Sequence, residues 1–308
     1  MLFKRVLILP ILFLIYATTF SQKSEKYKLF EQVNYIFPYQ LDKPDKTWKL
    51  PKKLIEISGL SFINKNRLAC VQDEKGNIYI FDLKTGEVDK KIEFGNDGDY
   101  EGIEIIENDA WILKSNGTLF KVKNYIKHKD PHIKKYPTVL SGKNDAEGLT
   151  YDLINNSLLI ACKGHPFVDE RDGKEFKAIY AFDLETKQLG SEPFLLIEMD
   201  SIKFYKNYNT MARMGIELLA YFDSSKGDAS FQPSGIAINP ITGNIFILAS
   251  VGNLMTVFSS DGKMLAMIEL STKIHPKPEG ICFSPNGTLY IANEGDNSYG
   301  TILKFESK

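Results

Sequence analysis

The chain is short of the residues that mark several common functional classes. Its 308 residues include only 3 cysteines and 4 histidines, and no CxxC pair or Cys/His cluster has the spacing of metal ligands. Basic and acidic residues nearly balance, 38 against 39, which leaves no strongly basic surface for nucleic acid. Each cysteine lies in an apolar, strand-like run, so all are expected to be free thiols in the core: Cys70, Cys162 and Cys282.

Long apolar runs are also absent, apart from one at the N-terminus. Lys4 and Arg5 precede an apolar run over residues 6–16, which is shorter than the roughly 20 residues that a membrane span needs. Small residues follow, so the sequence predicts a signal peptide over residues 1–21 and a mature domain over 22–308. The alternative is a retained N-terminal anchor. No cysteine follows the run, so a lipid-modified N-terminus is not expected, and the predicted location is periplasmic or secreted.

What the sequence does contain is a repeated motif and a 12% content of aromatic residues, which favours β-structure. In the motif, a Ser or Glu is followed by Gly and an aliphatic residue, and two further strand-like runs come after each copy, separated by polar turns. Short strands in units of about 40–45 residues are typical of β-propeller blades. The motifs begin at Ser58, Glu101, Glu147, Ser234 and Glu279.

The number of blades depends on one long interval. The stretch from Glu147 to Ser234 is about twice as long as the others, which would allow a sixth blade. Residues 200–222 nevertheless lack glycine turns and strand alternation, and apolar residues recur there at helical spacing: Met211, Met214, Leu218 and Tyr221. We therefore predict an all-β propeller of five blades with a helical insertion, six blades being the alternative. Residues 47–54 are expected to supply the missing outer strand of the last blade and close the ring.

These segments resemble the SdiA-regulated, YjiK-like family of exported bacterial propellers. The likeness rests on WKLPKKLIEISGLSF, DYEGIEII, AEGLTYD and KPEGICFSPNGTLYIANEG, and covers roughly residues 27–308. It implies a propeller fold, an extracytoplasmic location and a divalent cation, calcium being expected, near the central channel. It brings no assigned reaction. A wider likeness to gluconolactonase-like propellers, in which the Glu of the Glu-Gly pair binds metal, covers only the blade motif.

The motif residues are expected to face one another around one mouth of the channel. Three carboxylates so close together disfavour joint ionisation unless a cation or protons compensate, and hard oxygen ligands suit calcium. Glu101, Glu147 and Glu279 are therefore predicted metal ligands. Ser58 and Ser234 complete the ring and are candidate ligand-binding residues at the channel mouth. The alternative is a hydrated polar ring without an ion.

Other chemistry-bearing residues are expected on the rim of that mouth. The ends of the second strands supply candidate ligand-binding residues, Asp73, Lys163 and Glu294, and further polar neighbours: Glu74, Ser115 and Asn116. The long loop 163–176 places His165 there as a candidate acid or base, and the helical insertion emerges on the same side, with Met211 and Met214 as the packing face of a lid. The loop 125–136, with His128 and His132, is expected on the opposite face as a solvated turn.

Composition does not decide whether the chain is an enzyme. The leading interpretation is a monomeric ligand- or ion-binding propeller with calcium at the channel mouth and an unknown small molecule or protein on the loop-rich face. The alternative is a metal-dependent hydrolase of lactones or phosphoesters, in which Glu147 or Glu279 activates water. A third interpretation is a protein-interaction module. No membrane span is expected after signal cleavage.

Overall fold

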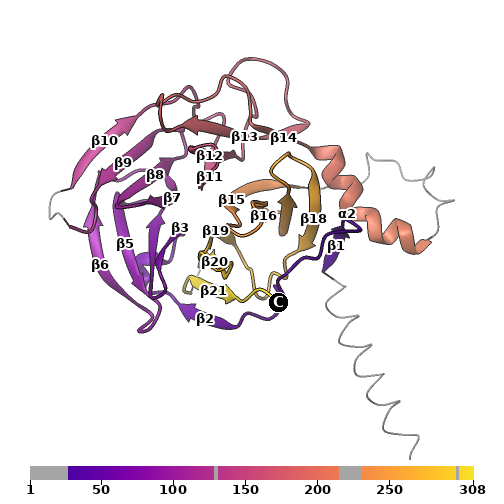
Figure 1. Ribbon diagram of the computed structural model, residues 1–308, viewed down its shortest axis with the longest axis horizontal. Helices are drawn as coiled ribbons and strands as arrows, with labels where there is room; N and C mark the ends of the chain where they lie inside the picture. Colours follow the sequence, from indigo (N-terminus) through magenta and orange to yellow (C-terminus); the bar gives the residue numbers. More distant parts are fainter. Residues whose placement is uncertain (1–26, 128–130, 215–229, 296–297) are drawn as a thin grey trace, which may run out of the picture.

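Five β-sheets surround a central channel (Figure 1). The computed structural model describes residues 27–127, 131–214, 230–295 and 298–308, the side chains of 207–214 excepted. Each sheet is an antiparallel blade in which neighbouring strands follow one another in the sequence, apart from the strands that the N-terminal segment adds. The prediction of a five-bladed, all-β propeller is confirmed, and the long interval between the third and fourth motifs contains no sixth sheet in the part that the structure describes.

The strands occupy equivalent places in each blade. The innermost strands carry the repeated motif: β3 (Ile57–Asn64), β7 (Tyr100–Ile106), β11 (Ala146–Asp152), β15 (Gln232–Ile238) and β19 (Pro278–Phe283). The second strands are β4 (Arg67–Gln72), β8 (Asp109–Lys114), β12 (Ser157–Cys162), β16 (Ile245–Val251) and β20 (Leu289–Asn293). The third strands are β5 (Asn77–Asp82), β9 (Leu119–Lys123), β13 (Phe176–Asp183), β17 (Leu254–Phe258) and β21 (Thr301–Phe305). The outer strands are β6 (Glu87–Glu93), β10 (His132–Tyr136), β14 (Leu195–Glu198), β18 (Met264–Glu269) and β2 (Lys46–Lys49).

The hydrophobic core is divided among the interfaces between blades. Second strands such as SLLIAC in β12 are buried throughout, because both faces of a blade are covered by its neighbours. Outer strands such as EVDKKIE in β6 are mostly exposed and charged, which protects the sheet edge from pairing with other chains. Each described cluster of buried side chains joins two adjacent blades. The blades are thus fixed to each other rather than to a separate core.

The N-terminal segment closes the ring, as predicted. Strand β2 pairs antiparallel with β21, so the last blade contains strands from both ends of the chain (Figure 1). Trp48 of β2 packs between the last and first blades, and its indole N–H donates a hydrogen bond to the Leu83 carbonyl at 3.0 Å. A 3-10 helix, η1 (Lys52–Leu54), then leads into β3.

A second N-terminal strand was not predicted. β1 (Lys28–Glu31) pairs with β18 and adds a fifth strand to the fourth blade. Helix α2 (Met199–Met214) lies beside it (Figure 1), and the rings of Phe30 and Tyr205 are 4.1 Å apart. The helical insertion is therefore confirmed for its described part. Leu218 and Tyr221 lie outside the described residues, as do the side chains of Met211 and Met214.

The three cysteines are buried and unpaired, as expected. No described helix is long and apolar enough to cross a membrane. The predicted signal peptide over residues 1–21 lies outside the described residues, as does His128.

Candidate functional site at the channel mouth

The first residue of each motif is the extra residue of a β-bulge. In β11, Ala146 pairs with Cys162 and Gly148 with Ala161, which leaves Glu147 without a partner across the strand pair. The same register shift falls at the motif of every innermost strand. Bulges re-aim a side chain relative to the pleat and are enriched beside functional sites. Here they direct the motif residues to a small cavity on the channel axis, whose lining includes Ser58, Glu101, Glu147, Ser234 and Glu279.

The glycine that follows each bulged residue allows neighbouring innermost strands to approach closely. A Cβ added to Gly102 would lie 2.7 Å from the Leu149 Cβ, and one added to Gly235 would lie 2.3 Å from the Glu279 carbonyl oxygen. These distances are too short for any side chain, so the glycines are required for packing of the innermost strands.

The two serines link adjacent blades. Ser58 Oγ donates a hydrogen bond to the Tyr100 carbonyl at 2.6 Å, and Ser234 Oγ donates to the Pro278 carbonyl at 2.7 Å. Each acceptor is the residue just before the next blade's glutamate. In the blades with glutamate, the same position places a carboxyl group at the mouth instead.

The three glutamates are held in conditions that oppose their ionisation. Glu147 and Glu279 are buried, and Glu101 is partly buried. Burial, followed by repulsion from Glu147, raises the pKa of Glu101 well above its usual range. Burial and the charge of Glu147 raise the pKa of Glu279 to about 8. The pKa of Glu147 is also raised by burial, although Lys163 acts against this shift.

Two lysines supply part of the missing positive charge. Lys163 Nζ lies 2.5 Å from Glu147 Oε1 and 3.7 Å from Asp145 Oδ2. Lys277 Nζ lies 4.0 Å from Glu279 Oε1 and forms an ion pair with Glu294. Of the predicted residues, Lys163 therefore contacts the ring directly at Glu147, and Glu294 is linked to Glu279 through Lys277.

Sequence reasoning missed a second tier of charged residues, which lie two positions before four of the five bulged residues. Asp99 interacts with Glu101 and raises the pKa of Glu101 further, because two neighbouring carboxyl groups disfavour joint ionisation. Asp145 and Lys277 occupy the equivalent places in the third and fifth blades, and Glu56 does so in the first. The available signal was the recurrence of a charged residue two positions before the motif in four of the five repeats.

The remaining rim residues divide into two kinds. Asp73 lies near Glu56 and Glu294; burial and the charges of these neighbours raise its pKa to about 6. Its Oδ1 atom is buried and accepts no hydrogen bond. Asn116, in contrast, is exposed, and its Oδ1 accepts the Thr118 amide at 3.1 Å within a turn. Glu74 is also exposed, and Ser115 is partly buried.

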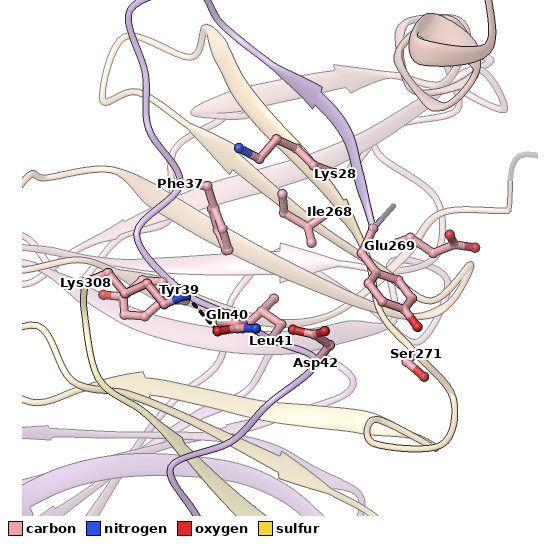
Figure 2. A pocket seen from close by; sticks show the side chains of 11 residues that line it. Lys28, Phe37, Tyr39, Gln40, Leu41, Asp42, Ile268, Glu269, Ser271 and Lys308 are labelled. Carbon is pink, nitrogen blue, oxygen red and sulfur yellow. Dashed lines mark hydrogen bonds between the residues drawn. The ribbon is translucent and has the colours of Figure 1, made fainter. Parts of the chain in front are cut away.

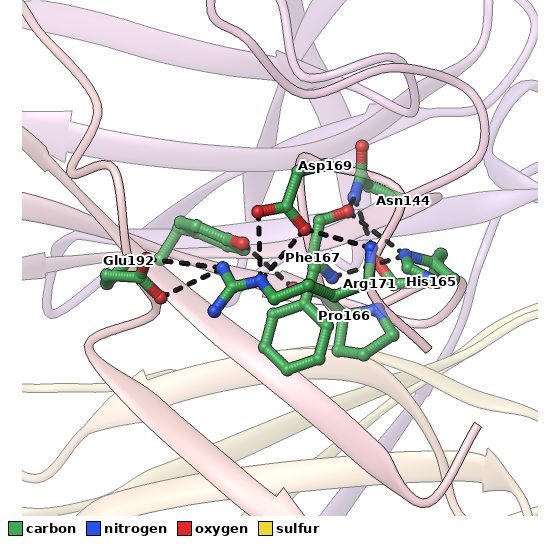
Figure 3. Close-up of polar contacts among 8 residues, drawn as sticks. Asn144, His165, Pro166, Phe167, Asp169, Arg171 and Glu192 are labelled. Carbon is green, nitrogen blue, oxygen red and sulfur yellow. Dashed lines mark hydrogen bonds and ion pairs between the residues drawn. The ribbon is translucent and has the colours of Figure 1, made fainter. Parts of the chain in front are cut away.

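The long loop of the third blade is tied down by its own contacts (Figure 3). Asn144 Nδ2 donates to the carbonyls of His165 and Phe167, both at 2.9 Å. Arg171 pairs with Asp169 and Glu192, and its guanidinium lies 4.3 Å from the centre of the Phe167 ring. His165 Nδ1 faces the Phe167 backbone, so His165 belongs to this loop network and is not among the residues that line the axial cavity. His132 is exposed on the edge strand β10.

The axial cavity has a volume of about 10 Å³, which is room for one water molecule or ion. No three His, Cys, Asp or Glu side chains of the described residues are already arranged to hold a metal ion. The donor set nevertheless fits a hard cation, since it consists of carboxylate and hydroxyl oxygens. Carboxylates also outnumber ammonium groups here, so the mouth attracts cations.

A separate cavity of about 130 Å³ lies between the N-terminal segment and β18 (Figure 2). It is lined by Phe37, Ile268 and Glu269 among others, and Lys308 Nζ donates to Gln40 Oε1 at 2.7 Å on one side of it. Its residues do not overlap with those of the channel mouth.

Five blades around a channel lined by motif residues define the chain as a β-propeller. The sequence matches the SdiA-regulated family over residues 40–300, and the chain belongs to that family. The resemblance found in the motifs is thereby confirmed. No curated protein matches the sequence.

Among the solved structures compared, one with a TM-score above 0.5 supports the fold, and the fold alone. Glutaminyl cyclase from Myxococcus xanthus superposes with a TM-score of 0.55 at 12% identity, over 86% of this chain and 95% of that chain. Aldose sugar dehydrogenase from Streptomyces coelicolor, in its PQQ-bound form, has a TM-score of 0.49 at 12% identity, over 86% and 98% of the two chains. Streptogramin B lyase has a TM-score of 0.47 at 12% identity, over 85% and 97%. Identities this low carry no information about activity.

Proposed function

We propose that this chain is a ligand-binding propeller whose channel mouth binds one divalent cation, calcium, through Glu101, Glu147 and Glu279. The observation that carries the proposal is the convergence of three carboxyl groups, each on a β-bulge, at one cavity of about 10 Å³. Mutual repulsion and burial keep the three carboxyls from ionising together without compensation. A divalent cation would supply that compensation, and carboxylate oxygens are its preferred ligands.

The ammonium groups of Lys163 and Lys277 compete with calcium for the glutamate carboxylates. In the absence of a cation, Lys163 neutralises Glu147 and Lys277 lies near Glu279. Binding then requires Glu147 to exchange the ammonium for the metal, whereas Glu101 needs only to lose a proton. Calcium binding is therefore expected to release protons near neutral pH.

We favour a binding role over hydrolysis because of space. The cavity among the ring residues accommodates an ion or a water molecule, and a lactone or phosphoester is far larger. A bound cation would instead organise the surrounding rim, where Asp73 presents an unpartnered oxygen. Export through the N-terminal signal is part of the proposal, since millimolar calcium is available outside the cytoplasm to sites of modest affinity; the N-terminus of the secreted form, determined by mass spectrometry, tests it.

Calorimetry on chelator-treated protein tests the metal site directly. We expect one calcium ion per chain, with an increase in the melting temperature. A variant with Glu101→Gln, Glu147→Gln and Glu279→Gln should remain folded and lose both effects. A matched control carries Glu87→Gln, Glu107→Gln and Glu185→Gln, which remove three exposed carboxylates elsewhere, and should bind as the original protein does. Equal binding by the two variants would overturn the proposal.

A further inference from the structure

A much larger cavity occupies the other end of the channel. It has a volume of about 630 Å³, within the range of sites for small organic molecules. Its lining includes the residues three positions after each bulged residue, about 10 Å further along the innermost strands: Ser61, Glu104, Thr150, Ala237 and Cys282. It also includes the turns that join innermost to second strands, such as 153–155. It shares no residue with the axial cavity at the mouth.

We call these five residues, each three positions after a bulged residue, the inner ring. Glu104 is the only one of them with a carboxylate side chain. Ser61 Oγ donates a hydrogen bond to Glu104 Oε1 at 3.0 Å, and the Ile105 amide donates to the same oxygen at 3.2 Å. The amide of Tyr151 is a further donor. These contacts fix the carboxylate in one orientation and come from neutral groups.

No lysine or arginine is found among the described residues that line this cavity. None of the ion pairs found among the described residues involves Glu104. A partly buried carboxylate without a cation is costly, and burial raises the pKa of Glu104 to about 7. The cavity thus offers a preorganised anion that still needs a counter-charge.

Much of the remaining lining is apolar. Phe62, Tyr151 and Phe283 line the cavity and form what we call the aromatic wall. Three large apolar side chains at its entrance are exposed: Leu153 (76%), Ile154 (83%) and Phe194 (39%). Exposed apolar residues around a concave site mark a surface that binds an apolar partner, and aromatic rings also attract cations.

We infer that this cavity binds a small organic cation with an apolar body, its ammonium group paired with Glu104 and its hydrocarbon against the aromatic wall. An anionic ligand would meet the carboxylate and be repelled, and a neutral apolar ligand would leave the carboxylate uncompensated. The site is independent of the calcium proposed at the opposite mouth.

Three compounds of similar size and different charge test the inference: phenethylamine, phenethyl alcohol and hydrocinnamate. Binding is measured by calorimetry and by ligand-observed NMR in the presence of a chelator, so the outcome does not depend on the calcium site. We expect the amine to bind at least about tenfold more tightly than the alcohol, and hydrocinnamate to bind least. Equal affinities for the amine and the alcohol would overturn the inference.

Variants locate the site. Glu104→Gln should weaken amine binding about tenfold or more and leave the alcohol unaffected, whereas the exposed control Glu185→Gln should change neither. If Glu104→Gln fails to fold, the pH dependence of ligand binding by the original protein tests the assignment.

Amine affinity should fall as pH drops through 7 and Glu104 becomes neutral, while alcohol affinity stays constant. The other titratable groups that line the cavity are Tyr151, Asp152 and Cys282, and burial raises the pKa of the Cys282 thiol, so it stays uncharged in this range. An amine affinity that changes neither in Glu104→Gln nor with pH would refute the assignment.

Discussion

Lys163 Nζ lies 2.5 Å from Glu147 Oε1, and the lysine is the residue that follows the second strand of the same blade. Strand β12 ends at Cys162, which pairs with Ala146, so the bulge at Glu147 and the end of β12 come to the same level of the channel. The ion pair is therefore a direct product of strand register.

Replacing this lysine should separate stability from calcium affinity. Lys163→Met leaves the buried Glu147 carboxylate without its charged partner and is expected to lower stability by about 1–3 kcal/mol in chelator. Calcium then meets no competing ammonium, so its affinity should rise about tenfold, equivalent to about 1.4 kcal/mol. Thermal melts and calorimetry measure the two effects. The exposed neighbour Lys174→Met is the control, and weaker calcium binding by Lys163→Met would contradict the expectation.

The glutamate ring should make stability depend on pH. Because burial raises the pKa of these carboxyls, to about 8 at Glu279, the folded protein retains protons that the unfolded chain releases near pH 4.5. The ring therefore destabilises the calcium-free protein progressively as pH rises from about 4.5 through 8. Relative to the variant with three glutamines, the melting temperature should fall over this range, and calcium should reduce the fall. The variant with three glutamines should show a shallower slope, the remainder coming from Glu104 and Asp73, whose pKa values burial also raises; an unchanged slope would show that the ring is not its source.

His275 should produce the opposite dependence in acid. The side chain is fully buried, stacks on Phe305 and donates from Nε2 to the Leu41 carbonyl at 2.9 Å. Burial lowers the pKa of His275 to about 4. In the unfolded chain its imidazole takes up a proton near pH 6.5, whereas in the folded protein it stays neutral until about pH 4. Its contribution is complete above pH 6.5 and is lost as pH falls towards 4, by up to about 3 kcal/mol.

The His275→Gln variant tests this assignment. It should be less stable than the original at neutral pH and should show a shallower loss between pH 6.5 and 4, as measured by denaturant unfolding at fixed pH. A parallel loss in both proteins would assign the effect to other groups.

The close approach of the innermost strands predicts a sharp difference between two glycines. Gly102→Ala places a Cβ 2.7 Å from the Leu149 Cβ and should destabilise the protein by about 1–3 kcal/mol through overpacking. Gly142→Ala is the matched control, because its Cβ would meet nothing within 4 Å. Denaturant midpoints measure the stability of both variants. Equal midpoints would mean that the innermost strands can move apart to accept a Cβ at Gly102.

The propeller could be predicted because its signal is repeated. Five copies of one motif, each followed by two strand-like runs, are far less ambiguous than any single strand, and the closing strand was implied by a last unit that lacked one. β1 carries no repeat and consists of four residues, so nothing local distinguishes it from a loop. Its pairing with β18 depends on the position of the outer edge of the fourth blade in the closed ring, which only the tertiary structure fixes.

The candidate ring could likewise be predicted from the motif, whereas its surroundings could not. Lys163 was placed on the rim, but its contact with Glu147 depends on register shifts that the sequence does not specify. The inner ring with Glu104 had a visible signal, a polar residue three positions after each of several bulges. That signal was easily missed, since single Ser or Thr residues are common in strands.

The bulges also bear on how such a protein can change over generations. The residue at each mouth position is the one that its blade leaves out of the hydrogen-bond ladder, so exchanging it removes no cross-strand pairing. The residues that maintain the fold, the glycines and the buried second strands, are therefore different from the residues that face the channel mouth. Each of the five bulged positions can be substituted without changing the residues that maintain the fold. Relatives with the same blades can thus differ in what they hold at the axis.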